Sequence, residues 1–351
     1  MKIHYGGIEF KKLIIKEFGN TELETLRTGI CGTDREIVKG KLQLARPEIG
    51  NELILGHEAV ARVSNSDNSE FKSGDIVVPV VRLPGSCRIC KLGRQDYCED
   101  GEFVESGVRG KNGFMRKKFY YDSKFLVKVS NSNIKDLAVL TEPLKNVMKM
   151  VEIFNFQRYR IPWFCEDSTL SCKNLYVFGT GTEGLLASVI FKREGLNVIA
   201  VNRHPVGEKV LNFLEHNGIE FFDSSKENIA KKKKDLSIDF AIDAVGSMEI
   251  LETISINIRN NGIVILFGTS GQNKLTNKDL ITSLVDKNIS ITGTVDGSKK
   301  HYEEAIKFLS DFGEARNLRN IITGVVEPTN LSVFERKGED EIKTIIEWEG
   351  V

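Results

Sequence analysis

The first third of the chain alternates short apolar runs with turn residues. Runs such as Glu58–Val63 and Asp75–Val81 are rich in β-branched residues and close in Gly, Pro or Asn-Ser clusters. This alternation is typical of short strands in a barrel-like domain. From Ile134 to Phe156 the apolar residues recur at helical spacing, interrupted at Glu142-Pro143.

A different pattern begins near residue 171, where apolar strands alternate with helical stretches. The predicted strands are 175–178, 197–201, 240–244 and 262–267. Such alternation indicates a parallel sheet with helices on both faces. A last strand, 343–348, is expected to return to the first domain. The 351 residues fit two domains. We therefore expect an α/β protein with a barrel-type domain over 1–170 plus 305–351 and a doubly wound domain over 171–304.

A glycine motif follows the first strand of the second domain and opens a helix predicted over Leu185–Lys192. A lone motif of this kind matches many loops, but the preceding strand and the following helix make it specific for a dinucleotide. The glycines allow a tight turn, close approach of the pyrophosphate and close helix packing. The predicted cofactor-binding residues are Gly179, Thr180, Gly181, Thr182, Glu183 and Gly184, together with Phe267, Gly268 and Thr269 at the end of a later strand.

The second strand of this domain ends at Asn202-Arg203. A site specific for NAD usually has Asp or Glu there, bound to the ribose 2′-hydroxyl. Asn202 is uncharged, and the guanidinium of Arg203 can pair with a 2′-phosphate. We therefore predict NADP as cofactor, with NAD also accepted because nothing in the sequence acts against it. A surface arginine without a cofactor role is the alternative.

Charge and hydropathy indicate which classes of binding partner the sequence favours. The 49 basic and 49 acidic residues cancel, so composition indicates neither a nucleic-acid nor an anionic-membrane partner. The one basic block, Lys231–Lys234, has no interleaved aromatic residues and is interpreted as a solvated helix end. Neither a signal peptide nor an apolar segment of membrane-spanning length is found. We expect a cytoplasmic protein.

The six cysteines do not resemble a disulfide framework. Three of them crowd into residues 87–98 and another, Cys31, stands beside glycine and threonine. In a reducing compartment this placement favours metal binding or catalysis over cross-linking. Cys165 and Cys172 lie in no motif and are interpreted as structural residues.

Two short motifs, Cys31–Asp34 and Gly56–Glu58, carry the candidate chemistry. Catalytic zinc needs about three protein ligands and one open position, and thiolate, imidazole and carboxylate meet that need. Zinc lowers the pKa of a bound alcohol, so that its carbon can release hydride. Thr33 could pass the proton onward. Alone, Cys31 or His57 would be typical of buried packing; together, ahead of a dinucleotide motif, they are specific.

Three further segments accompany these motifs. They are GRQDYC at residues 93–98, GFMR at 113–116 and LTEPL at 140–144. The combination resembles the zinc-containing medium-chain dehydrogenases and, within them, the archaeal glucose 1-dehydrogenases, over nearly the whole chain. The resemblance implies a GroES-like catalytic domain, a Rossmann domain and a homotetramer. It also implies oxidation of D-glucose, and of D-galactose, at C1 to the lactone with NADP or NAD.

Carried onto matching positions, the resemblance implies a catalytic zinc on Cys31 and His57. Glu58 and Glu142 are both candidates for the third ligand, directly or through water, and the choice between them stays open. All four residues, with Thr33, are the expected catalytic set.

The expected sugar contacts are Thr33, Glu105, Glu142 and Asp296. Glu105 matches a glutamate that hydrogen-bonds sugar hydroxyls in this family, and a charged loop tip is the alternative. A carboxylate suits that task because it accepts from two adjacent hydroxyls, and leaving it unpaired penalises deoxy analogues. Asp296 stands where relatives often have Asn, which leaves its role open.

A second departure concerns the cysteine lobe. Many members of the family hold a structural zinc on four cysteines, whereas here Cys87, Cys90 and Cys98 remain and Pro84 takes the first position. A tetrahedral site wants four ligands. Asp100 or Glu102 could complete it, or the lobe could stand without metal.

Two other functions compete with an aldose dehydrogenase. One is a zinc dehydrogenase of another polyol or secondary alcohol. The other is a regulatory or structural protein that kept the fold and lost the chemistry. Such a protein should have lost a zinc ligand or the glycine motif, and the sequence retains both.

Overall fold

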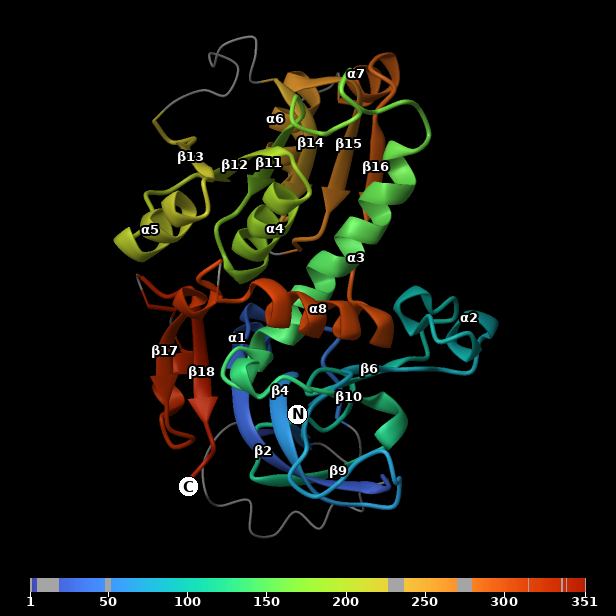
Figure 1. Cartoon of the computed structure of the whole chain (residues 1–351), viewed down its shortest axis with the longest axis vertical. Coiled ribbons are helices and arrows are strands. Elements are labelled where there is room, and N and C mark those ends of the chain that lie inside the picture. Colours follow the sequence, from blue (N-terminus) through green and yellow to red (C-terminus); the bar gives the residue numbers. More distant parts are fainter. Residues whose placement is uncertain are drawn as a thin grey trace. The chain divides into compact units, whose positions relative to one another are not determined.

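The computed structural model describes residues 2–4, 19–47, 52–226, 237–269, 280–314, 316–335, 337–338 and 340–350, which leaves Lys231–Lys234 outside the described residues. The chain divides into two compact units (Figure 1). Unit 1 comprises Met1–Lys145 and Asp296–Val351, and unit 2 comprises Asn146–Val295. The first boundary falls inside helix α3 (Thr141–Arg158). The units therefore divide at 145/146 and 295/296, whereas the expected domains divide at 170/171 and 304/305.

Unit 1 is built on a seven-stranded sheet of order β10-β5-β4-β2-β18-β17, with β9 also paired to β2. The C-terminal strand β18 pairs antiparallel with β2, so the tail of the chain completes this sheet. The sheet's strands are β2 (Thr21–Ile30), β4 (Glu58–Ser66), β5 (Ile76–Pro79), β9 (Lys118–Tyr121), β10 (Leu126–Lys128), β17 (Ile322–Val326) and β18 (Lys343–Glu347).

Smaller elements complete unit 1. Two short sheets comprise β1 (Lys2–His4) with β3 (Glu52–Ile54), and β6 (Arg82–Leu83) with β7 (Val104–Ser106) and β8 (Gly110–Lys111). The helices are α1 (Gly32–Val38), α2 (Arg88–Lys91) and α8 (Lys299–Phe312). Single 3₁₀ turns lie at Gln95–Tyr97, Ser123–Phe125, Ser132–Ile134, Ala138–Leu140, Leu318–Ile321 and Leu331–Phe334.

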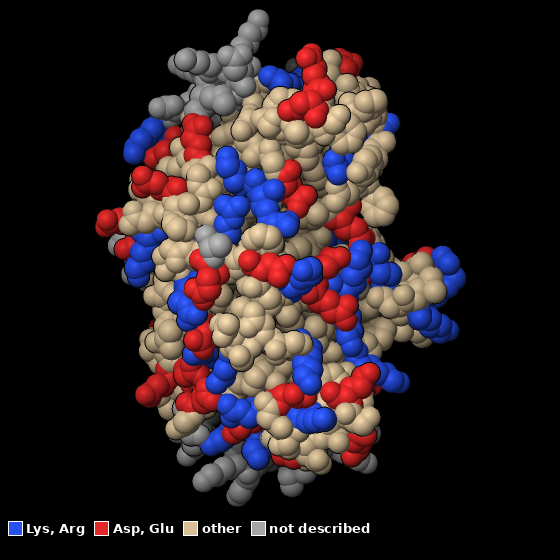
Figure 2. Space-filling model, in the orientation of Figure 1, with Lys and Arg blue, Asp and Glu red and all other residues tan. Residues whose placement is uncertain are grey.

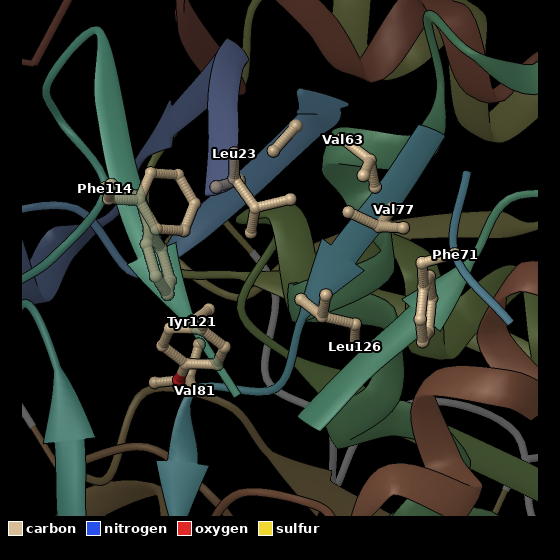
Figure 3. Packing of buried hydrophobic residues seen from close by; sticks show 11 residues of the cluster. Leu23, Val63, Phe71, Val77, Val81, Phe114, Tyr121 and Leu126 are labelled. Atoms are coloured by element: carbon tan, nitrogen blue, oxygen red, sulfur yellow. The ribbon is translucent and has the colours of Figure 1, made fainter. Parts of the chain in front are cut away.

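The core of unit 1 follows from strand alternation. Inward residues of β2, β4 and β5, such as Leu23, Val63 and Val77, belong to one buried cluster with the aromatic residues Phe114 and Tyr121 (Figure 3). The rings of Phe114 and Tyr121 pack edge to face, with their centroids 5.5 Å apart. Burying such aromatic and branched side chains removes a large apolar area from water, which is the main force stabilising this core.

Unit 2 contains a six-stranded parallel sheet of order β13-β12-β11-β14-β15-β16. This is the strand order 3-2-1-4-5-6 of a dinucleotide-binding sheet. Helix α4 packs against β11 and β12, as Figure 1 shows. The strands are β11 (Asn174–Phe178), β12 (Asn197–Asn202), β13 (Glu220–Asp223), β14 (Ile238–Asp243), β15 (Ile258–Leu266) and β16 (Ser290–Gly293); the helices are α4 (Thr182–Arg193), α5 (Glu208–His216), α6 (Met248–Asn257) and α7 (Leu280–Asp286).

Two local features differ from the sequence analysis. Pro143 does not interrupt a helix but lies in the first turn of α3, where backbone N–H groups have no helical acceptor and a missing donor costs little. Cys165 and Cys172 form a disulfide, which the sequence did not predict. The turn between them brings their Cα atoms to 5.8 Å, within the normal span of a disulfide.

Surface charge agrees with the balanced composition. Lysine and arginine atoms are interspersed with aspartate and glutamate atoms over the face shown in Figure 2. Among the described residues, none of the helices is long and apolar enough to span a bilayer.

Candidate active site

The two sequence motifs meet at the start of α1 and the start of β4. Cys31 follows β2 and caps α1, while His57 and Glu58 lie where the chain enters β4. Because β2 pairs with β4 and Gly29 is opposite Glu58, the strand register brings Cys31 beside the second motif. The ligand atoms of Cys31, His57 and Glu58 all lie within 4.8 Å of one another.

This group fits a zinc ion by its donor chemistry. Sulfur, nitrogen and oxygen ligands stand about 3.5 Å apart around a tetrahedral zinc, so only small side-chain movements are needed. His57 and Glu58 are buried and Cys31 is half-buried. Burying a carboxylate and an imidazole in one place is costly unless a cation or a charged partner compensates.

Asp34 orients two members of this group. Its Oδ1 lies 3.3 Å from Nδ1 of His57, and its Oδ2 accepts a hydrogen bond of 2.9 Å from the backbone N–H of Cys31. Burial by itself lowers the pKa of His57, but the Asp34 carboxylate outweighs it and raises that pKa well above its ordinary value. A carboxylate behind one imidazole nitrogen leaves the other nitrogen for a metal.

Glu58 is held by a lysine from the C-terminal strand. Nζ of Lys343 lies 2.6 and 2.7 Å from the two carboxylate oxygens of Glu58 and donates to the carbonyl of Ile30 at 3.3 Å. Both charged side chains are buried, with 3% and 0% exposure. Lys343 belongs to no sequence motif and could not be predicted, because the two partners are 285 residues apart.

The three carboxylates among the expected sugar contacts lie in one row of alternating charges in unit 1. Arg82 bridges Glu105, at 2.8 Å from Nη2 to Oε1, and Asp296, at 2.7 Å from Nε to Oδ2. Lys145 then bridges Asp296 and Glu142, the second at 3.1 Å from Nζ to Oε1. Both cations were missed by the sequence analysis, since neither belongs to a motif.

Arg82, Asp296, Lys145 and Glu142 are buried, and these four groups shift one another's pKa. For Asp296, burial favours the neutral acid, yet Lys145 and Arg82 lower its pKa below the ordinary value. For Glu142, burial dominates and raises the pKa despite Lys145. The two carboxylate oxygens of Asp296 are thus paired with Arg82 and Lys145, while Glu105 keeps 19% of its side chain exposed. Thr33 lies half-buried in the first turn of α1.

The glycine motif of unit 2 has the expected shape. Gly179 has φ of +106°, which disfavours any side chain, and a Cβ on Gly184 would lie 2.0 Å from the carbonyl oxygen of Gly179. At Gly181, the N-cap of α4, a Cβ would meet nothing within 4 Å. The turn therefore leaves an open cradle at the N-terminus of α4, where backbone N–H groups attract phosphate.

Two neighbouring turns support this cradle. The carboxylate of Asp243, at the end of β14, accepts hydrogen bonds from the backbone N–H groups of Val245 and Gly246 at 2.9 and 2.8 Å. The backbone N–H groups of Phe267 and Gly268 donate to the carbonyl of Asp243 at 2.9 and 3.0 Å. Asp243 is a supporting residue that was not predicted from the sequence, although an acid at the end of a buried strand is a signal for one.

The cysteine lobe brings three sulfur atoms together. The ligand atoms of Cys87, Cys90 and Cys98 lie within 4.8 Å of one another. Backbone N–H groups, that of Cys90 first, lower the pKa of Cys87 to about 7, whereas burial raises that of Cys90 to about 12. The thiol of Cys98 donates to Oδ1 of Asp100 at 2.9 Å.

Glu102, the other acid considered for this lobe, accepts a hydrogen bond of 3.2 Å from Ser86. Of the two acids that could complete a tetrahedral set, Asp100 is thus the one in contact with a cysteine sulfur.

Comparisons with known proteins agree along nearly the whole chain. Residues 19–131 match the alcohol dehydrogenase GroES-like domain, and residues 135–348 match the glucose dehydrogenase C-terminus. Glucose 1-dehydrogenase of Thermoplasma acidophilum is 39% identical, covering 98% of this chain and 96% of that protein. Glucose 1-dehydrogenase of Metallosphaera sedula is 40% identical, covering 97% of this chain and 96% of that protein. The Haloferax mediterranei glucose dehydrogenase structure in complex with NADP, Zn and gluconolactone has a TM-score of 0.84 and 26% identity, over 97% and 95% of the chains.

Proposed function

This chain belongs to the glucose dehydrogenase family, as the resemblance in its sequence predicted, with a GroES-like and a Rossmann domain; on that basis we propose that it oxidises D-glucose at C1 with transfer of hydride to NADP. One observation carries the proposal. A zinc-type ligand group and a row of buried carboxylates occur in the same unit, and the two sets suit a polyhydroxy substrate.

The ligand group would hold zinc through Cys31 and His57, with Glu58 or Glu142 as the third ligand. When bound, zinc acts as a Lewis acid and favours loss of a proton from a hydroxyl group. Asp34 holds the His57 ring in place, and the Thr33 hydroxyl passes the released proton toward solvent. Lys343 neutralises Glu58 while the carboxylate is not engaged by a metal.

The carboxylates would recognise the sugar. Glu105 is partly exposed and can accept from two adjacent hydroxyls, and Glu142 supplies a second acceptor. Asp296 would act near the substrate mainly as the counter-ion that fixes Arg82 and Lys145. An alcohol without neighbouring hydroxyls cannot donate the hydrogen bonds that these carboxylates accept, so the site discriminates against it.

The glycine motif would bind the dinucleotide, with the pyrophosphate at Gly181 and the N-terminus of α4. Arg203 would pair with the 2′-phosphate of NADP. Use of NAD, oxidation of D-galactose, a homotetrameric assembly and a cytoplasmic location are further parts of the proposal, which rest on the family resemblance.

A turnover assay tests this function. The zinc-loaded protein is incubated with NADP and, separately, glucose, galactose, xylose and ethanol, and absorbance of the reduced nicotinamide is followed. We expect turnover on glucose and galactose and little on ethanol. Comparable rates on ethanol would favour a general alcohol dehydrogenase, and a Cys31→Ser protein that stayed fully active without metal would refute the zinc mechanism.

We also propose that the cysteine lobe holds a second zinc through Cys87, Cys90, Cys98 and Asp100. Metal analysis should find two zinc ions per chain in the native protein and one in Asp100→Ala. Glu102→Ala is the matched control and should retain two. An equal loss in both variants, or one zinc in the native protein, would contradict this assignment.

A further inference from the structure

An ion pair in unit 2 lies at the end of the second strand, the position that recognises the cofactor's ribose in dinucleotide-binding sheets. Nη1 of Arg203, just after β12, is 2.9 Å from Oε2 of Glu249, in the first turn of α6. α6 follows β14, and β11 lies between β12 and β14 in the sheet. Arg203 follows β12 and Glu249 lies after β14, on either side of β11. Their contact therefore passes across the turn between β11 and α4, which contains the glycine motif.

The Arg203–Glu249 pair supplies a carboxylate, that of Glu249, where the end of β12 lacks one. The end of β12 carries Asn202, whose side-chain amide donates to the carbonyl of His204 at 3.0 Å and so shapes the turn instead. Parallel strands end at one edge of the sheet, so residues after β12 and β14 share the ligand edge. Glu249 thus stands beside Arg203, although the two are 46 residues apart and no sequence pattern links them.

Two neighbouring acids are already committed to their own turns. Asp243 accepts from backbone N–H groups of the turn after β14. Asp223, at the end of β13, accepts from the backbone and hydroxyl of Ser225 at 3.0 and 2.6 Å. By contrast, Arg203 and Glu249 are 70% and 67% exposed, so a ligand can separate them at little cost.

We propose that Glu249 is a specificity-determining residue for the cofactor, which rests on the proposed use of a nicotinamide dinucleotide. With NAD, the Glu249 carboxylate accepts hydrogen bonds from the ribose hydroxyls, the task usually performed by an acid at the end of the second strand. With NADP, Arg203 turns to the 2′-phosphate, and the negative charge of Glu249 weakens binding of that phosphate. The pair makes the site open to both cofactors.

Fluorescence titration of the metal-free protein with NADPH and NADH tests this at fixed ionic strength, since salt screens exposed charges. Glu249→Gln removes the charge and keeps the shape. We expect its Kd for NADPH to fall roughly three- to tenfold and its Kd for NADH to rise by a similar factor. The matched control is Glu194→Gln, because Glu194 pairs with Arg193 at the opposite end of α4 from the glycine motif.

The outcomes separate this inference from the function on which it rests. Opposite shifts for the two cofactors in Glu249→Gln, with none in the control, support it. Shifts in the same direction, or no shift while the native protein binds both cofactors, overturn it and leave the dehydrogenase intact. A native protein that binds neither cofactor refutes both, and that result is visible before any variant is made.

Discussion

Removing Lys343 should destabilise unit 1 because it leaves a buried carboxylate without its partner. Lys343→Met keeps the length of the side chain and deletes the charge facing Glu58. At 2.6 Å the attraction between the two charges is roughly 6 kcal/mol for an effective dielectric constant of about 20. Much of this offsets the cost of burying both ions, yet breaking one side of such a pair typically costs about 3–5 kcal/mol.

The two tryptophans allow the loss of stability to be measured in unit 1 alone. Trp348 lies in unit 1, where its indole donates to Thr28 at 2.9 Å, and Trp163 lies in unit 2. Urea unfolding of metal-free protein in a Trp163→Phe background therefore reports unit 1 through Trp348 fluorescence. We expect Lys343→Met to lower the free energy of unfolding by about 3–5 kcal/mol, with the loss partly restored by added zinc, which can engage Glu58 in place of the lysine.

Lys128→Met is the matched control. Lys128 pairs with Asp75 at the same distance, 2.6 Å, but its side chain is 41% exposed. An exposed pair contributes about 0–1 kcal/mol. If the two lysine variants lost equal stability, or if Lys343→Met lost less than about 1 kcal/mol, the buried pair would not have the strength that its geometry implies.

Four other perturbations test separate parts of the structure. Asp34→Asn should weaken zinc binding about 10- to 100-fold in a chelator competition, and an unchanged affinity would show that the carboxylate does not orient the ligands. Gly184→Ala should lower Tm because its Cβ would lie 2.0 Å from a backbone oxygen, whereas Gly181→Ala should keep Tm and weaken NADPH binding; the reverse pattern would contradict the assigned cradle. Cys165→Ser should reduce the free energy of unfolding by about 2.5 kcal/mol through loss of loop closure, and dithiothreitol should do the same to the native protein but not to the variant. In metal-free protein, alkylation of Cys87 should accelerate as pH rises through its pKa of about 7, as the thiolate replaces the thiol; a rate independent of pH between 6 and 8, about one unit either side, would contradict that pKa.

Local patterns were enough to find the residues that lie within motifs. Cys31 and His57 belong to short segments whose residue types match zinc chemistry, and the glycine motif follows a strand and opens a helix. The structure gives both glycine positions a physical reason, a positive φ at Gly179 and a close backbone contact at Gly184. Such features depend on neighbours a few residues away, which a sequence pattern contains.

The charged partners could not be found in this way. Lys343 lies 285 residues from Glu58, and Lys145 lies 151 residues from Asp296. Lysine and glutamate are common on protein surfaces, so their identity alone predicts exposure. The disulfide between Cys165 and Cys172 was missed for a related reason, because bridging depends on how the turn between them folds.

The sequence by itself therefore determined the two-part α/β architecture, the family, the metal-ligand candidates and the dinucleotide turn, since periodicity and short motifs are properties of neighbouring residues. Only the tertiary structure decided which charges face one another. It placed Lys343 on Glu58, set Lys145 and Arg82 between the carboxylates, and brought Glu249 to Arg203. Those pairings arise from strand order and register, which join residues that the sequence keeps far apart.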